Sequence, residues 1–238
     1  SELGRLNLDM QVLKYYIKRF GSGVESFGEE TFKYRNLTLQ VNKYKFNGVD
    51  FYEQANIDQS KMSFQKILET YNKVRQLVGD EQMKKLKRVL ITDVRNPDDD
   101  YWSRVHGYDF PSAATGGDGE INIWKYANKD SLDETFAHES GHVIDVDRKI
   151  SNSKKWMLAV KNDGNFASSY AEEAFNKRKV NKCAEDFAES LANLYKIGTV
   201  EFQRKYPHRF EILKQILSET SNTQSNSNFI NIIKKLFE

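Results

Sequence analysis

The residues with the clearest chemical meaning are the His-Glu-Ser-Gly-His sequence at positions 138–142, an H-E-x-x-H pattern. If they share a helix, His138 and His142 lie one turn apart on one face, where both imidazoles can bind a single metal ion. Glu139 then lies beside that ion, where its carboxylate can take a proton from metal-bound water. The alternative is an ordinary pair of helix histidines. The chain has only four histidines in all.

The residues around this pattern predict the helix that it requires. Positions 131–134 read S-x-x-E, a capping box that predicts a helix beginning at Ser131. Within that helix Leu132, Phe136 and Val143 fall on one side, and the two histidines fall roughly opposite. The histidines therefore point away from the core-facing side, which favours a functional site.

A second predicted helix begins near residue 184 and offers a third ligand. A zinc ion held by two histidines needs one more protein ligand and leaves its fourth position for water. Glu185 is the candidate, and Glu189 lies on the same face one turn later. Asp145 is a rival ligand, for which we prefer a supporting or helix-capping role. Cys183 is expected on the other side of the second helix as a small buried or surface thiol, with zinc capping as the alternative.

From residue 138 to about residue 217 the chain resembles the protease domain of anthrax lethal factor and the related Pro-Pro endopeptidases. The segments that carry the resemblance are H-E-S-G-H-V-I-D at 138–145, S-S-Y at 168–170, E-D-F-A-E at 185–189 and Y-P-H-R-F at 206–210. The resemblance implies a zinc peptidase with one Zn²⁺ per chain, bound by His138, His142 and Glu185. It implies that Glu139 is the general base, that Tyr170 donates a hydrogen bond to the oxyanion, and that Glu189 orients a ligand histidine.

The position of Tyr170 departs from the pattern of those enzymes. It precedes Glu185 by 15 positions, a wider separation than theirs, and the charged residues between predict a helical or loop insertion. The alternative is a tyrosine packed at a helix end. Tyr195 is a poor substitute because it lies on the apolar stripe of its helix.

The resemblance implies an α+β fold with two lobes, like that of the zincin metalloproteases. A small mixed sheet and the metal-binding helix would form the N-terminal lobe, and helices the C-terminal lobe, with the cleft near residue 147. Residues 1–60 are expected to form a helix (8–20) and a β-hairpin lead-in turning at Asn47-Gly48. Residues 61–218 would form the catalytic domain, and residues 219–238 a polar linker and terminal helix.

The segment before the metal-binding helix is predicted to bind substrate. Residues 120–124 alternate like a strand, and we expect an edge strand along which a peptide binds in extended form. Gly117, Gly119 and Ile121 are the candidate contacts. Trp102 could wall a subsite, although core packing is the favoured interpretation. The acidic residues 96–100 favour a solvated loop over a calcium site.

Composition narrows the remaining function classes. The chain has 238 residues, a net charge of +2 and one cysteine, which excludes an internal disulfide. No apolar run is long enough for a membrane span, and no basic block indicates nucleic acid. We expect a secreted monomer, with delivery as a toxin included and the cytoplasm less favoured, that cleaves a protein or peptide. The alternative is a catalytically silent binding or toxin-delivery module with the same fold.

Overall fold

The computed structural model describes residues 23–107 and 110–218, which form an α+β fold around one mixed sheet. The six strands have the order β1-β2-β3-β4-β6-β5, so β1 and β5 are the edges. β3, β4 and β6 are parallel to one another, and the other pairs are antiparallel. The strands are β1 (Glu25–Tyr34), β2 (Leu37–Phe46), β3 (Val49–Gln54), β4 (Arg88–Ile91), β5 (Ala114–Gly117) and β6 (Glu120–Ile123).

The first three strands belong to the same sheet as the rest. The predicted turn between β2 and β3 is confirmed, because Asn47 and Gly48 both have positive φ angles, as a two-residue type I′ hairpin turn requires. Tyr34, at the end of β1, contacts Trp124, which follows β6, and their ring centroids are 5.5 Å apart. The segment expected as a lead-in therefore supplies three of the six strands. The helices predicted at 8–20 and 229–237 and the linker at 219–228 lie outside the described residues.

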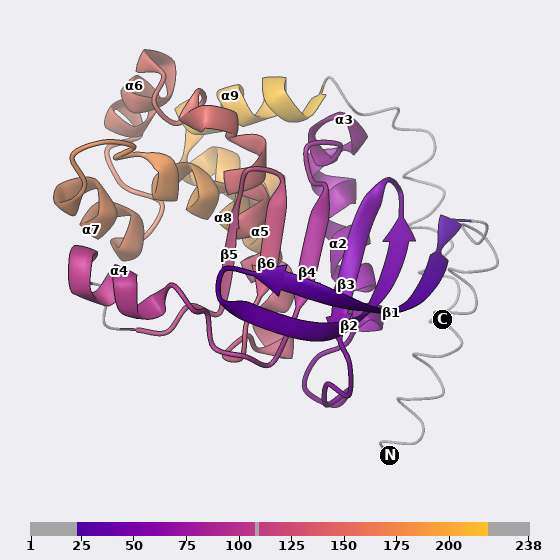
Figure 1. Cartoon of the computed structure of the whole chain (residues 1–238). Helices are drawn as coiled ribbons and strands as arrows, with labels where there is room; N and C mark the ends of the chain where they lie inside the picture. The colour runs from indigo at the N-terminus through magenta and orange to yellow at the C-terminus, as the bar shows by residue number, and fades with distance from the viewer. Residues whose placement is uncertain (1–22, 108–109, 219–238) are drawn as a thin grey trace.

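Helices cover one face of the sheet and extend beyond β5 (Figure 1). α5 contacts α2, β5 and β6 as well as α8, and most of its residues are buried. α6 and α9 pack together, as do α7 and α8. The helices are α2 (Phe64–Val78), α3 (Asp80–Met83), α4 (Asp99–His106), α5 (Leu132–Ile144), α6 (Lys154–Asp163), α7 (Ser169–Lys177), α8 (Ala184–Lys205) and α9 (Pro207–Ser218).

The start of α5 differs from the predicted capping box. The helix begins at Leu132, but the Ser131 side chain makes no capping hydrogen bond. A short 3-10 helix, η2 (Lys129–Ser131), precedes α5 and is capped instead by the Asn128 side chain. Ser131 has φ −110° and ψ 9°, which is not the extended conformation in which a capping serine reaches the backbone. The predicted start of the helix at Ser131 is confirmed, since Ser131 is the N-cap residue, but the predicted capping hydrogen bond from its side chain is absent.

The acidic segment is not the solvated loop that was expected. Its last two residues begin α4, and Asp99 is buried. The Asp99 carboxylate accepts hydrogen bonds from the backbone nitrogen of Ser112 (3.1 Å) and from its hydroxyl (2.7 Å). These bonds tie α4 to the chain that leads into β5.

Within residues 23–107 and 110–218, no helix combines the length and apolar character needed to cross a membrane.

Candidate active site

Two small residues bring the helices of the site into close contact. A Cβ atom added to Gly141 of α5 would lie 2.8 Å from the Cα atom of Ala188 in α8, closer than real side chains approach. The H-E-x-x-H pattern therefore needs glycine at its fourth position in this fold. This close approach places Glu185 opposite the two histidines.

His138, His142 and Glu185 converge as the sequence predicts. The Oε2 atom of Glu185 lies 3.2 Å from Nε2 of His138 and 3.1 Å from Nε2 of His142. One ligand atom from each residue falls within a group no wider than 4.8 Å. Two imidazole nitrogens and one carboxylate oxygen form a donor set that could hold one metal ion.

The charges of this group are strongly coupled. Burial alone lowers the pKa of His138, but the carboxylates of Glu185, Glu189 and Glu139 more than offset this and raise it well above its usual value. Burial alone raises the pKa of Glu185, yet the two histidines hold it well below its ordinary range. A positive charge between these side chains is therefore favourable, in addition to that of Arg178, which binds the other oxygen of Glu185.

Glu139 lies between the metal-binding residues and the edge of the sheet. Its side chain is buried, and burial raises its pKa while the neighbouring histidines partly offset the effect. A Cβ atom added to Gly116 of β5 would lie 2.8 Å from Cβ and Oε2 of Glu139. The edge strand can thus run directly against the Glu139 side chain only because residue 116 is glycine.

Glu189 and Asp145, the two carboxylates predicted to support the site, make different contacts. Oε2 of Glu189 lies 3.8 Å from Nδ1 of His138, the ring nitrogen that faces away from Glu185. Asp145 is fully buried and accepts hydrogen bonds from the backbone nitrogens of Ile150 and Ser151 and from the Ser151 hydroxyl. Its oxygens are committed to the turn after α5, which agrees with a capping role and not with the rival metal-ligand role.

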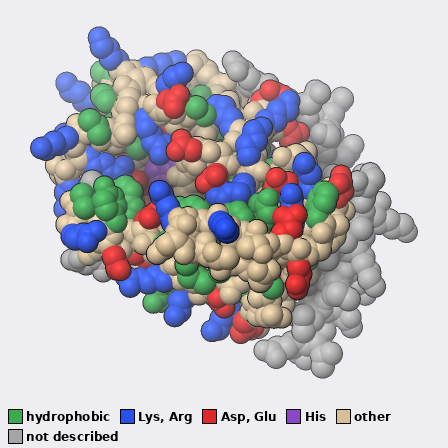
Figure 2. All heavy atoms as spheres, in the orientation of Figure 1, with side chains coloured by type: hydrophobic (Ala, Val, Ile, Leu, Met, Phe, Trp, Pro, Cys, Tyr) green, Lys and Arg blue, Asp and Glu red, His purple; other side chains and the backbone are tan. Residues whose placement is uncertain are grey.

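Tyr170 and Trp102 both line the cavity that contains the triad, which has a volume of about 310 Å³. α7 accounts for the wide spacing before Glu185, since Tyr170 lies in its first turn and its ring centroid is 6.5 Å from that of His138. The preferred interpretation of Trp102 as a core residue was wrong, because 39% of it is exposed. Figure 2 shows histidine atoms recessed in a hollow of the molecular surface.

The strand predicted to form the edge of the sheet, residues 120–124, corresponds to β6, but the edge strand is its neighbour β5. β6 lies between β4 and β5, so Ile121 is fully buried and cannot contact a substrate. Gly119 lies in the turn between the strands, next to Lys85 and Lys87 and outside the cavity lining. Gly117 does lie on the edge, in β5, which is the strand beside α5. The error arose because the sequence does not show that residues 114–117 form a strand of their own.

Two arginines of the cavity were missed. Arg178, which follows α7, donates from Nη2 to the Oε1 atom of Glu185 at 2.8 Å and leaves Oε2 towards the histidines. Arg148, just after α5, also lines the cavity and lies near Gly117 of β5. No pattern in the sequence singled out either residue, since both reach the site through turns. Gly116 was also missed, although it directly precedes Gly117, which was a candidate contact.

Cys183 and Tyr195 lie outside the cavity around the triad. Cys183 is buried at the start of α8, and its burial raises the thiol pKa to about 11, which agrees with a structural thiol. The Tyr195 hydroxyl donates to Asp133 at 3.0 Å, on the other side of α8. Neither residue joins the metal-binding group among the described residues.

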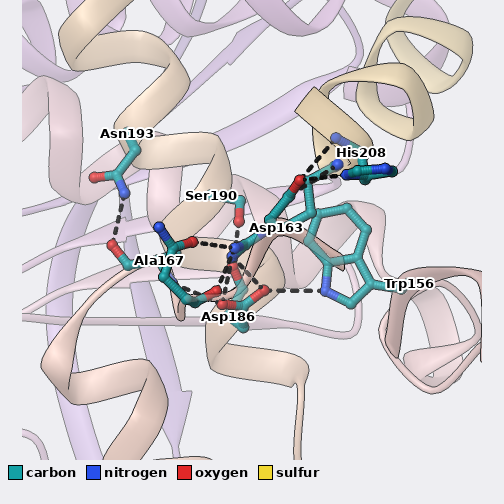
Figure 3. A network of polar contacts seen from close by, with 9 residues as sticks. Trp156, Asp163, Ala167, Asp186, Ser190, Asn193 and His208 are labelled. Carbon is teal, nitrogen blue, oxygen red and sulfur yellow. Dashed lines mark hydrogen bonds and ion pairs between the residues drawn. The ribbon is translucent and has the colours of Figure 1, made fainter. Parts of the chain in front are cut away.

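A buried polar network supports α8 next to Glu185 (Figure 3). Asp186 accepts hydrogen bonds from the Trp156 ring nitrogen, the backbone nitrogen of Ala167 and the Arg209 guanidinium. Arg209 is fully buried and also binds Asp163 through Nε at 3.0 Å. Asn193 donates to the Ala167 carbonyl, so the chain just before α7 is fixed to α8 at two points. The network holds together the elements that carry Glu185 and Tyr170.

Comparisons of the chain with models of known protein families, with curated proteins and with solved structures find no match. The function must therefore be argued from the site itself.

Proposed function

We propose that this protein is a zinc-dependent endopeptidase that cleaves a protein or peptide bound in extended form. The observation that carries the proposal is the convergence of His138, His142 and Glu185 within 4.8 Å. Glu139 lies in the same cavity. The donor set fits zinc, which prefers imidazole and carboxylate ligands in a tetrahedral site with one position left for water.

Each side chain has a distinct part in this reaction. Bound zinc would polarise the scissile carbonyl and lower the pKa of its water from about 16 towards 7. Glu139 takes the proton of the attacking water and then delivers it to the leaving amine. The raised pKa of its buried carboxyl group suits a residue that must both accept and donate a proton. Arg178 holds the side chain of Glu185 in position, and Glu189 holds that of His138.

Tyr170 and β5 would position the substrate. Tyr170 lines the cavity with its ring near His138, and this supports its hydroxyl as the donor of a hydrogen bond to the developing oxyanion. β5 pairs only with β6 among the described strands, so its other edge can accept a peptide as an added strand. The sheet with α5 on one side and helices α6–α9 on the other would then form the two lobes of a zincin-like enzyme. We retain monomeric state and secretion as parts of the proposal.

Replacement of Glu139 by Gln tests the mechanism. We expect the variant to keep one zinc ion per chain, measured by atomic absorption, and to lose peptide hydrolysis by about 10²–10⁴-fold, the contribution of a general base. Glu134→Gln is the matched control, because Glu134 lies in the first turn of the same helix and away from the cavity.

The same assay separates the alternatives. A silent binding module would hold zinc in the wild type but hydrolyse no peptide from a diverse library, and chelation would change nothing in the products. A purely structural zinc site would need a fourth protein ligand, which the described residues do not provide within this group. Full turnover in Glu139→Gln would contradict the mechanism.

A further inference from the structure

Arg148 has an unusual backbone that directs it back towards the active site. Asp147 and Arg148 have φ angles of 53° and 56°, so two consecutive residues with side chains adopt the left-handed conformation. This conformation is unfavourable for residues other than glycine, and it persists where the surrounding structure requires it. The turn brings Arg148 into the lining of the cavity that contains the metal-binding triad.

The guanidinium of Arg148 is held in place by one of its nitrogens. Nη1 donates to the carbonyl oxygen of His142 at 3.1 Å and to that of Asp145 at 3.3 Å. Nη2 lies 3.3 Å from the position that a Cβ atom on Gly117 would occupy, so it faces the edge strand β5. The group therefore spans the end of the metal-binding helix and the strand along which a peptide would bind.

The charge of Arg148 is not neutralised by a described carboxylate. The other arginine of the cavity, Arg178, forms an ion pair with Glu185. Asp99, which also lines the cavity, lies 3.5 Å from Arg95 and accepts hydrogen bonds from Ser112. Arg148 forms no ion pair within residues 23–107 and 110–218, and its hydrogen bonds there use only Nη1. Nε and Nη2 therefore remain as donors in a fork that matches a carboxylate.

We infer that Arg148 binds a carboxylate group of the substrate, so that the enzyme selects peptides with a negative charge next to β5. The inference rests on the proposed peptidase function for the substrate class, but the binding step stands on the geometry of Arg148 alone. The carboxylate can come from an acidic side chain within the peptide or from a free C-terminus. The chemistry at Arg148 is the same in both cases.

A helix-capping role alone would explain only part of this arrangement. The two carbonyl contacts use Nη1, and a lysine ammonium or an amide side chain could make them. The other two donor nitrogens, Nε and Nη2, take no part in these contacts with the end of the helix. A capping residue would affect all peptides equally, whereas a substrate contact changes the ratio between charged and uncharged peptides.

The experiment measures peptide binding separately from hydrolysis. Dissociation constants are measured by fluorescence anisotropy on zinc-loaded Glu139→Gln protein, with position-scanning pools of short peptides that carry Glu or Gln at one fixed position. A second pair of pools has a free or an amidated C-terminus. We expect about tenfold or tighter binding of the charged member of one pair, as a charge-assisted hydrogen bond provides.

The preference should depend on Arg148 and not on charge in general. Arg148→Gln in the same background should reduce the ratio between charged and uncharged peptides to near one, and Arg148→Lys should keep part of it. Lys149→Gln removes the same charge from the neighbouring residue, whose side chain is 79% exposed, and should leave the ratio as it was. Each ratio compares two dissociation constants measured on the same protein. A partly unfolded fraction therefore affects both constants alike and leaves their ratio unchanged.

Two results would overturn the inference. One is equal binding of charged and uncharged pools by the parent protein. The other is a charge preference that survives Arg148→Gln or disappears in Lys149→Gln. Absence of hydrolysis by the wild type would instead contradict the proposed function and leave the binding result intact.

Discussion

Glu185 and Asp186 are neighbours at the start of α8, and both are buried, yet they belong to two very different groups of charges. Asp186 faces α6, α9 and the chain before α7, where both of its oxygens accept hydrogen bonds from Arg209, Trp156 and Ala167. Glu185 faces α5, where its partners are the two histidines and Arg178. One residue of separation takes the chain from one group to the other.

The difference lies in how each group obtains its balancing charge. Around Asp186 the chain supplies a permanent cation in Arg209, which binds Asp163 as well. Around Glu185 the chain supplies Arg178 for Oε1, but Oε2 faces the two imidazoles, and Nδ1 of His142 is a buried nitrogen with no hydrogen-bond partner among the described residues. A carboxylate whose two oxygens both accept hydrogen bonds from the chain is a structural support, whereas a carboxylate with one oxygen turned towards two imidazoles is suited to a metal ion.

The largest expected effect comes from exchanging the two carboxylates for amides one at a time. Glu185→Gln removes a metal ligand, so zinc affinity should fall by more than the 10–100-fold typical of a residue that only supports a ligand, and hydrolysis should be lost with it. Asp186→Asn should keep zinc in the folded protein and lower the free energy of unfolding by about 1.5–3 kcal/mol, the worth of a charged hydrogen bond. Zinc titration and urea unfolding of both variants measure this, and equal zinc loss in the two would contradict the division.

Removal of Arg209 should break the structural group. Arg209→Met would leave Asp163 and Asp186 buried without their cation, and such a loss typically costs about 3–5 kcal/mol in unfolding free energy. Urea denaturation at neutral pH is the measurement. Arg204→Met is the matched control, because Arg204 is exposed and among the described residues pairs only with Glu201 in its own helix. An unfolding free energy equal to that of the control would show that the group is not a support.

The sequence predicted the group of His138, His142 and Glu185 well because each part of it is local. Helical periodicity places His138 one turn from His142, and the same rule places Glu185 and Glu189 on one face of the next helix. That these faces meet is a tertiary fact, which the resemblance supplied and the structure bears out. The supporting group was invisible in the sequence, because Asp163, Asp186 and Arg209 come from three helices with no shared spacing.

The errors concern features that depend on neighbours in space. Which strand forms the edge of the sheet follows from pairing, and residues 114–117 are too short and glycine-rich to predict as a strand. Trp102 was assigned to the core from its residue type, but α4 holds it at the rim of the cavity. Arg148 reaches the cavity only because two residues adopt a left-handed backbone, which residue type does not predict.

A smaller effect should follow from separating the helices that join the two groups. Gly141→Ala would place a Cβ atom 2.8 Å from Ala188, so the helices must shift, at a cost of about 1–3 kcal/mol in unfolding free energy. Zinc affinity should fall as well, because Glu185 moves with α8. Thermal denaturation and competition with a chelator report the two effects. Since the nearest atom is the Ala188 backbone Cα, the further change Ala188→Gly should fail to restore zinc affinity, and full rescue would contradict this account.

The smallest effect should appear as a change in the acid sensitivity of the structural group. Burial alone raises the pKa of Asp163, but hydrogen bonds from His208 and Arg209 more than offset this and hold it below its ordinary value. A carboxyl group with a lowered pKa in the folded state contributes stability above its unfolded pKa of about 4, and this contribution is lost as the pH falls through the folded value. Asp163→Asn should therefore reduce the free energy of unfolding at neutral pH and flatten its decline below about pH 4, measured by urea unfolding across pH.

Asp118→Asn, at an exposed turn, is the control and should keep the wild-type slope of unfolding free energy against pH. If the slope of Asp163→Asn matched the wild type, the acid sensitivity would have to come from other carboxylates, and the network around Arg209 would not be the pH-dependent part of the fold.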